Sequence, residues 1–133
     1  MKLLLDTHVW IWSAIDPARL KKDVAKALDD ADNELWLSPI SIWELSVLVK
    51  KQRIELDDDV QVWVQRALNT AKFREAPLTN DVVLRESSIR FSHRDPADHF
   101  IAASAMVFNL TLVTADPRLL KLKQQGLAVL AAG

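Results

Sequence analysis

The sequence predicts an α/β protein, a three-layer sandwich in which a central parallel β-sheet of four or five strands is flanked by helices. Short apolar runs alternate along the chain with longer segments of helical period. The apolar runs are too short for independent helices and lack strict alternation, which is typical of strands buried on both faces. Because strands separated by helices need crossover connections, the strands should run parallel.

Each predicted strand is a short, mainly apolar run. The first lies at the start of the chain, and the others follow at intervals long enough for helices. The clear strands are Leu3–Leu5, Leu35–Leu37, Leu110–Val113 and Leu127–Leu130, with a weaker one around Phe73–Ala76.

In the segments between these runs, apolar residues recur at the three- and four-residue spacing that is typical of helices. Within Asp57–Ala71, for example, Val60, Trp63, Val64 and Leu68 recur at three- and four-residue spacing, which gives one apolar stripe. The predicted helices are Thr7–Ile15, Asp23–Ala31, Ile40–Lys51, Asp57–Ala71, Asn80–Arg90, Ala97–Asn109 and Pro117–Gln124.

Composition limits the classes of protein. With 133 residues, 50% of them hydrophobic, the chain should form one domain over residues 1–133. A formal net charge of −1 gives no general attraction to nucleic acid, so a polyanion would need a local basic patch. The absence of cysteine excludes disulfides and thiolate metal sites, and only two glycines leave no glycine-rich phosphate loop.

We do not expect the apolar start of the chain to act as a signal peptide. Asp6 interrupts it after three leucines, no small-residue cleavage site follows, and no run approaches the ~20 apolar residues of a spanning helix. We therefore expect a soluble, cytoplasmic protein without membrane association.

Acidic residues stand where the predicted strands end or the following helices begin. Asp6 and Asp116 follow the first and the Leu110 strands, Glu44 lies six residues past the Leu35 strand, and Asp98 opens an apolar helix. Ligands of parallel sheets bind beyond the carboxyl ends of the strands, so these side chains can meet there. A cluster of hard oxygen ligands suits Mg²⁺ or Mn²⁺ better than zinc.

Helix capping explains each of these acids singly. Asp116-Pro117 and Asp95-Pro96 are common helix starts, and Ser41 with Glu44 forms a capping-box pattern. Independent caps, however, have no reason to converge on one edge of a sheet. Two carboxylates ~4 Å apart repel by ~4 kcal/mol at an effective dielectric of 20, so a converging group implies a cation.

Four motifs in order give the chain a family resemblance: "LLLDTHVWIW", "SPISIWEL", "RDPADHFIAASA" and "LTLVTADPRL". Together they resemble the PIN-domain ribonucleases, and within them the VapC-type toxins of type II toxin–antitoxin pairs. The resemblance implies an endoribonuclease that uses Mg²⁺ or Mn²⁺ to hydrolyse phosphodiester bonds in RNA, forms a homodimer and is neutralised by a protein antitoxin.

The resemblance also implies site residues. The family's catalytic acids fall on Asp6, Glu44, Asp98 and Asp116, with Asp6, Asp98 and Asp116 as metal ligands and Glu44 acting through water. We expect supporting roles for Thr7, Thr114, Asp95 and His99. An arginine usually follows the family's third acid, so His99 is a candidate substitute for it.

Other residues carry weaker signals. The basic residues near the motifs, candidates for RNA contact, are Lys50, Lys51, Arg53, Arg90 and Arg94, although each is also consistent with a solvated surface charge. His93 and His99 are peripheral candidates. Tryptophans in apolar segments favour the core or a protein interface, and Trp10, Trp12 and Trp43 are candidates for a partner surface.

Other functions fit less well. A receiver-type phosphoacceptor domain needs an adjacent acidic pair after its first strand, and a haloacid-dehalogenase-type phosphatase needs an aspartate two residues after Asp6, where His8 stands. The alternative from another class is a PIN-fold protein-binding module without nuclease activity. Such a protein should tolerate Asp6→Asn.

Overall fold

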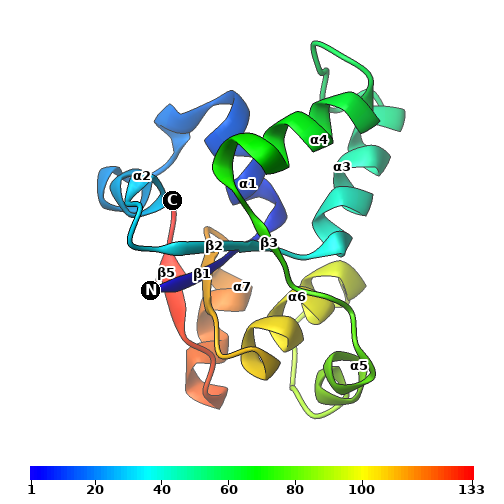
Figure 1. Ribbon diagram of the computed structural model, residues 1–133. Coiled ribbons are helices and arrows are strands. Elements are labelled where there is room, and N and C mark those ends of the chain that lie inside the picture. The colour runs from blue at the N-terminus through cyan, green and yellow to red at the C-terminus, as the bar shows by residue number, and fades with distance from the viewer.

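The computed structural model describes residues 1–133, which form a five-stranded parallel sheet with strand order β3-β2-β1-β4-β5 (Figure 1). The strands are β1 (Lys2–Leu5), β2 (Glu34–Leu37), β3 (Arg74–Glu75), β4 (Thr111–Thr114) and β5 (Val129–Ala131). β1 lies at the centre, with Leu4 paired with Trp36 of β2 on one side and with Leu112 of β4 on the other. The predicted parallel sheet is confirmed, including its weak fifth strand.

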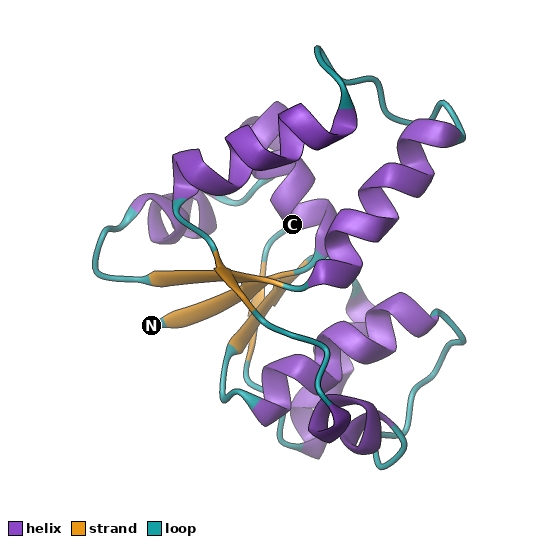
Figure 2. Cartoon of the chain, turned by 45° about the vertical axis from the view of Figure 1, so that its right-hand side comes forward, coloured by secondary structure: helices purple, strands orange, loops and turns teal.

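Helices cover both faces of the sheet (Figures 1 and 2). On one face lie α1 (Thr7–Ile15), α2 (Lys22–Asp29), α3 (Pro39–Lys50) and α4 (Val60–Ala71); on the other lie α5 (Asn80–Glu86), α6 (Pro96–Val107) and α7 (Pro117–Leu120). Two short 3₁₀ helices, Pro17–Arg19 and Lys121–Gln125, complete the chain. This is the three-layer α/β sandwich that the sequence predicts.

The side chains of β1 explain why the sheet is buried on both sides. Leu3 and Leu5 pack into the hydrophobic cluster on the face of α1 to α4, whereas Leu4 packs into the cluster on the face of α6 and α7. All three are fully buried. Because successive side chains of a strand point to opposite faces of the sheet, the leucines of β1 enter opposite layers in turn. Both layers are apolar, which explains the uninterrupted apolar run in the sequence.

Several predicted boundaries are wrong for local reasons. The helix predicted to reach Arg90 ends at Glu86, because the Ser87 and Ser88 hydroxyls donate to the carbonyls of Leu84 and Arg85. The helix predicted from Asp57 begins at Val60, since Asp59 accepts a hydrogen bond from the Gln61 N–H. The last strand spans Val129–Ala131, and the segment predicted as the helix Pro117–Gln124 changes to 3₁₀ geometry at Lys121.

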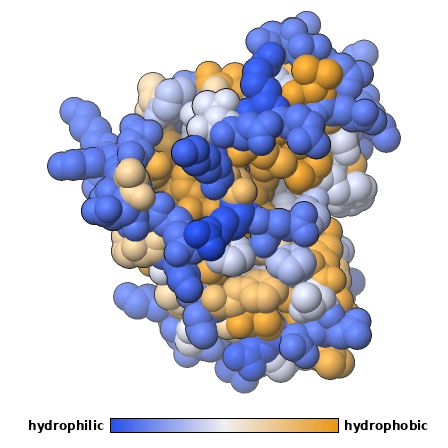
Figure 3. Space-filling model, in the orientation of Figure 1, coloured by the Kyte–Doolittle hydropathy of each residue, from blue (hydrophilic) through white to orange (hydrophobic).

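The remaining boundary shifts are small. The helix predicted over Asp23–Ala31 spans Lys22–Asp29, and the one predicted over Ala97–Asn109 spans Pro96–Val107. Asn109 lies outside that helix with a φ of 54°, in the left-handed region. No helix combines the length and the apolar character needed to cross a bilayer. On the face shown in Figure 3, hydrophobic residues are visible between charged and polar ones.

Candidate functional site

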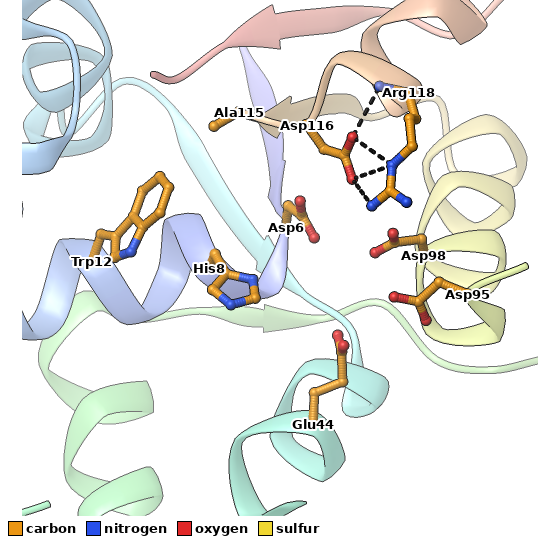
Figure 4. Close-up of a pocket in the computed structure, with 9 residues that line it drawn as sticks. All are labelled: Asp6, His8, Trp12, Glu44, Asp95, Asp98, Ala115, Asp116 and Arg118. Atoms are coloured by element: carbon orange, nitrogen blue, oxygen red, sulfur yellow. Dashed lines mark hydrogen bonds and ion pairs between the residues drawn. The ribbon is translucent and has the colours of Figure 1, made fainter. Parts of the chain in front are cut away.

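The predicted acids meet in one pocket of about 320 Å³ where β1 and β4 end (Figure 4). Asp6 follows β1, Asp116 follows β4, Glu44 comes from α3, and Asp98 lies in the first turn of α6. The residues that line the pocket are Asp6, His8, Trp12, Glu44, Asp95, Asp98, Ala115, Asp116 and Arg118. Residues more than one hundred positions apart in the sequence therefore share one acidic cavity.

Asp6 lies at the base of this pocket and is only 7% exposed. Its Oδ1 accepts a hydrogen bond of 2.8 Å from the Thr7 N–H, and its Oδ2 accepts one of 2.7 Å from the Thr114 hydroxyl. The same hydroxyl accepts a hydrogen bond of 3.1 Å from the Asp116 N–H. Thr114 therefore links the ends of β1 and β4 and fixes the direction of the Asp6 carboxylate.

Glu44 is held by α1 and does not cap its own helix. The Thr7 hydroxyl donates to Glu44 Oε1 and lies 2.9 Å from the Ser41 hydroxyl. Ser38 caps α3, with its hydroxyl accepting a hydrogen bond from the Ile40 N–H. The capping-box interpretation of Ser41 and Glu44 is therefore wrong, and the Glu44 side chain lines the pocket.

The two aspartates at the start of α6 differ in role. Asp95 caps the helix, since its Oδ1 accepts a hydrogen bond from the Ala97 N–H. Asp98 is 7% exposed, and its Oδ2 lies 2.9 Å from His93 Nε2. Both carboxylates line the pocket, so the cap also contributes charge to it.

Asp116 combines capping with an ion pair. Its Oδ1 accepts a hydrogen bond from the Arg118 N–H at the start of α7, and the Arg118 guanidinium contacts both carboxylate oxygens, the shortest contact being 2.8 Å (Figure 4). Arg118 is not among the residues predicted from the sequence. An arginine two residues after a helix-capping aspartate was the available signal.

Burial and mutual repulsion favour protonation in this pocket. Burial raises the pKa of Glu44 to about 7, against the effect of the Thr7 hydrogen bond, and neighbouring carboxylates add to the rise. Burial likewise raises the pKa of Asp98 to about 6, opposed by the His93 hydrogen bond. The pKa of Asp6 is also raised by burial, whereas the Arg118 hydrogen bond lowers that of Asp116. A bound cation would relieve this repulsion.

Comparisons with known proteins identify the family of this chain. The PIN domain family matches residues 3–124. The chain is 36% identical over 118 residues to Ribonuclease VapC22 of Mycobacterium tuberculosis, covering 88% of each protein. These matches decide the family.

The chain belongs to the PIN-domain family.

Solved structures share the PIN fold over nearly the whole chain. VapBC2 from Rickettsia felis, bound to a DNA fragment from its promoter, superposes with a TM-score of 0.73 at 18% identity, covering 100% of both chains. FitAcB from Neisseria gonorrhoeae gives a TM-score of 0.66 at 25% identity, covering 96% of this chain and 95% of its own. The resemblance inferred from the four motifs is confirmed.

The donor set of this PIN domain fits a divalent cation. Asp6, Asp98 and Asp116 offer carboxylate oxygens, which Mg²⁺ and Mn²⁺ prefer. One ligand atom from each of His93, Asp98 and Asp116 lies within 4.8 Å of the others. His93, which the sequence suggested only as a peripheral candidate, thus lies against two of the predicted ligands.

The other predicted residues lie around this site. Thr7 and Thr114 support it directly, whereas His99 does not line the pocket, so it is not placed as a substitute for the family's arginine. The basic candidates Lys50, Lys51, Arg53, Arg90 and Arg94 are exposed and also lie outside the pocket lining. Arg53 lines a neighbouring groove of about 470 Å³, which shares His8 and Trp12 with the pocket.

The tryptophans divide between core and surface. Trp10 is 1% exposed and packs edge-on against Trp63, with ring centroids 5.7 Å apart, so of the two predicted locations, core and partner surface, it occupies the core. Trp43 is 60% exposed on α3. Trp12 lies at the border of the pocket with the Arg19 guanidinium 4.5 Å above its ring.

Proposed function

We propose that this PIN domain is a metal-dependent endoribonuclease that hydrolyses phosphodiester bonds in RNA, and that it acts as the toxin of a type II toxin–antitoxin pair. The convergence of Asp6, Glu44, Asp98 and Asp116 on one pocket carries the proposal. The relative named Ribonuclease VapC22, 36% identical over most of the chain, supports the activity.

Asp6, Asp98 and Asp116 would hold Mg²⁺ or Mn²⁺ in this pocket. The bound ion would polarise the scissile phosphate and lower the pKa of a water molecule. Thr114 keeps one oxygen of Asp6 in a fixed direction, and Arg118 keeps Asp116 ionised by lowering its pKa. Thr114 thus limits the reorganisation of Asp6 on binding, whereas Arg118 occupies both oxygens of Asp116 and would have to release at least one of them to the ion.

Glu44 is suited to orient the attacking water and accept its proton. Burial raises the pKa of this carboxyl to about 7 in the metal-free pocket, and a bound cation would favour its ionised form, which can accept a proton. Its hydrogen bond from the Thr7 hydroxyl fixes the side chain while the other oxygen remains available.

RNA would approach along the groove beside the pocket. Arg53 lines this groove and can contact phosphates, and the Trp12 ring, which carries the Arg19 guanidinium on one face, lines it as well. We extend the proposal to contacts with RNA from Lys50, Lys51, Arg90 and Arg94, which lie on the exposed surface.

The partners and location follow from the same assignment. Structures with the same fold carry the VapBC name of toxin–antitoxin complexes, which supports a cognate protein antitoxin for this chain. We propose a homodimer that acts in the cytoplasm. Exposed apolar side chains on α3, α4 and α5 are available for these contacts: Trp43, Val62, Val83 and Leu84.

The test is cleavage of labelled RNA by the purified protein. The wild-type protein should cut in millimolar Mg²⁺ or Mn²⁺ and stop when the metal is chelated. Asp6→Asn should reduce cleavage by about a thousandfold or more, whereas the matched control Asp29→Asn, at the exposed end of α2, should cut like the wild-type protein. Equal activity of Asp6→Asn and wild type would favour a binding module instead.

A further inference from the structure

The segment between α5 and α6 brings a buried histidine against one acid of the pocket. Building on the proposed function, we propose that His93 is a positioning residue: its imidazole holds Asp98 Oδ2 and leaves Asp98 Oδ1 to ligate the metal. His93 Nε2 lies 2.9 Å from Oδ2, and the two side chains are 8% and 10% exposed. No protein hydrogen bond is formed to Oδ1, so one oxygen of the carboxylate is engaged and the other is available.

The hydrogen-bonding of the ring indicates which nitrogen carries the proton. Nδ1 of His93 is buried and has no partner. A proton on Nε2 makes the bond to the Asp98 carboxylate and leaves Nδ1 as a bare acceptor. A proton on Nδ1 alone would leave a buried N–H without an acceptor and would turn the lone pair of Nε2 towards a lone pair of Asp98 Oδ2. That arrangement has the higher free energy. His93 is therefore the donor in this pair.

His93 is itself fixed by residues of two helices. The Nε2–H of His99, on α6, donates a hydrogen bond of 2.7 Å to the backbone oxygen of His93, and His99 Nδ1 lies 3.2 Å from Glu86 Oε1 of α5. Phe91 stacks on the His99 ring with centroids 3.7 Å apart and planes 10° apart. His99, although outside the pocket, thus braces the histidine that holds Asp98.

The competing role for His93 is direct metal ligation. Its ring reaches within 4.8 Å of ligand atoms of Asp98 and Asp116, so geometry alone permits this. If Nε2 were the ligand, Nδ1–H would normally have an acceptor, and Nδ1 of His93 has none. Nδ1 itself is buried, and Nε2 is engaged with Asp98, so neither nitrogen is free to bind the ion. Imidazole ligation would also favour Mn²⁺ over Mg²⁺, whereas a histidine that only positions a carboxylate would affect both ions alike.

Three variants separate these roles. His93→Ala removes the donor, His93→Gln places an amide N–H near the position of Nε2, and Ser92→Ala is the control in the same exposed segment. Calorimetry measures the Kd of Mn²⁺ and of Mg²⁺ alone, and RNA cleavage gives kcat and KM. Circular dichroism establishes that each variant is folded.

We expect His93→Ala to weaken the binding of both Mn²⁺ and Mg²⁺ by about tenfold, so that the ratio of the two Kd values is unchanged. The same variant should lower kcat by a larger factor than it raises KM. His93→Gln should recover most of the metal affinity, and Ser92→Ala should match the wild-type protein. If His93→Ala does not fold, the ratio of Kd values in His93→Gln still decides the role.

Two results would overturn the assignment. Unchanged Kd values in both His93 variants would mean that the contact has no effect on the site. A loss of Mn²⁺ affinity alone that His93→Gln fails to restore would make His93 a ligand. A wild-type protein that binds neither ion would remove the proposed function itself, an outcome distinct from both.

Discussion

The Thr114 hydroxyl at the end of β4 donates a 2.7 Å hydrogen bond to Asp6 Oδ2 at the end of β1. Both residues are buried, Thr114 completely. This contact joins the first and the last sequence motifs across two neighbouring strands. The direction of Asp6 is thus set by a residue of a strand and not of a loop, which favours a preorganised carboxylate.

Thr114→Val should therefore destabilise the protein and weaken metal binding. Valine keeps the shape but leaves a buried carboxylate oxygen without its donor, which costs about 1.5–3 kcal/mol. Urea denaturation at neutral pH measures this loss. Thr114→Ser, which keeps the hydroxyl, should recover most of the stability; equal stability of the valine and serine variants would argue against a role for the bond.

Removal of one pocket charge should stabilise the protein without metal. Burial and neighbouring carboxylates raise the pKa of Asp98, so its ionised form is unfavourable in the fold. Asp98→Asn should raise the free energy of unfolding in chelator by about 1 kcal/mol, after allowance for screening by solvent, and abolish the rise in Tm with Mn²⁺. A variant less stable than wild type in chelator would contradict this electrostatic account.

The pH dependence of stability without metal has a defined sign. The folded pKa values of Glu44 and Asp98, about 7 and about 6, exceed their ordinary values of 4.5 and 3.8. The folded protein thus holds protons that the unfolded chain releases, so this stability is present below about pH 4 and lost as pH rises through about 7. Urea denaturation in chelator should show this decline, less steeply in Asp98→Asn. If the free energy of unfolding falls equally steeply with pH in both proteins, Asp98 does not cause the decline.

Divalent metal should stabilise the wild-type protein. A ligand that binds only the folded state at ~100 times its Kd adds ~2.7 kcal/mol to the free energy of unfolding. Thermal melts with increasing Mn²⁺ or Mg²⁺ should show a rising Tm, absent in Asp6→Asn and retained in the control Asp29→Asn. A wild-type melting curve that does not change in millimolar metal would count against the acidic site.

Arg118→Gln should separate metal binding from substrate binding. The guanidinium occupies both oxygens of Asp116, so its removal frees that carboxylate and should tighten Mg²⁺ binding by a few fold, measured by calorimetry. The loss of a cation beside the pocket should raise the KM for RNA. Weaker metal binding in this variant would mean that Arg118 holds Asp116 in the orientation the metal needs.

The sequence was sufficient to place the acids but not their partners. Strand-end position and helix order brought Asp6, Asp98 and Asp116 to one edge, because parallel strands share that edge whatever their order in the sheet. The order β3-β2-β1-β4-β5 could not be predicted, since all strand candidates had a similar apolar character. The contacts of Arg118 with Asp116 and of His93 with Asp98 could not be predicted either, because they depend on side-chain rotamers.

Two side-chain directions have the same physical origin. Ser41 and Glu44 fit a capping box by spacing, yet tertiary contacts with Thr7 determine the side-chain directions. Trp10, in an apolar segment, was a candidate for either the core or a partner surface, and α1 turns that side chain into the core against Trp63. In both cases packing between elements, and not local pattern, determines the side-chain direction.

The most direct test of the central claim is the mapping of RNA 5′ ends in bacteria expressing the wild-type protein or Asp6→Asn. We expect growth arrest and new 5′ ends with the wild-type protein, and neither with the Asp6→Asn variant, which removes one of the charges converging on the pocket. Identical 5′ ends and growth in the two strains would contradict the assignment of these acids to RNA cleavage.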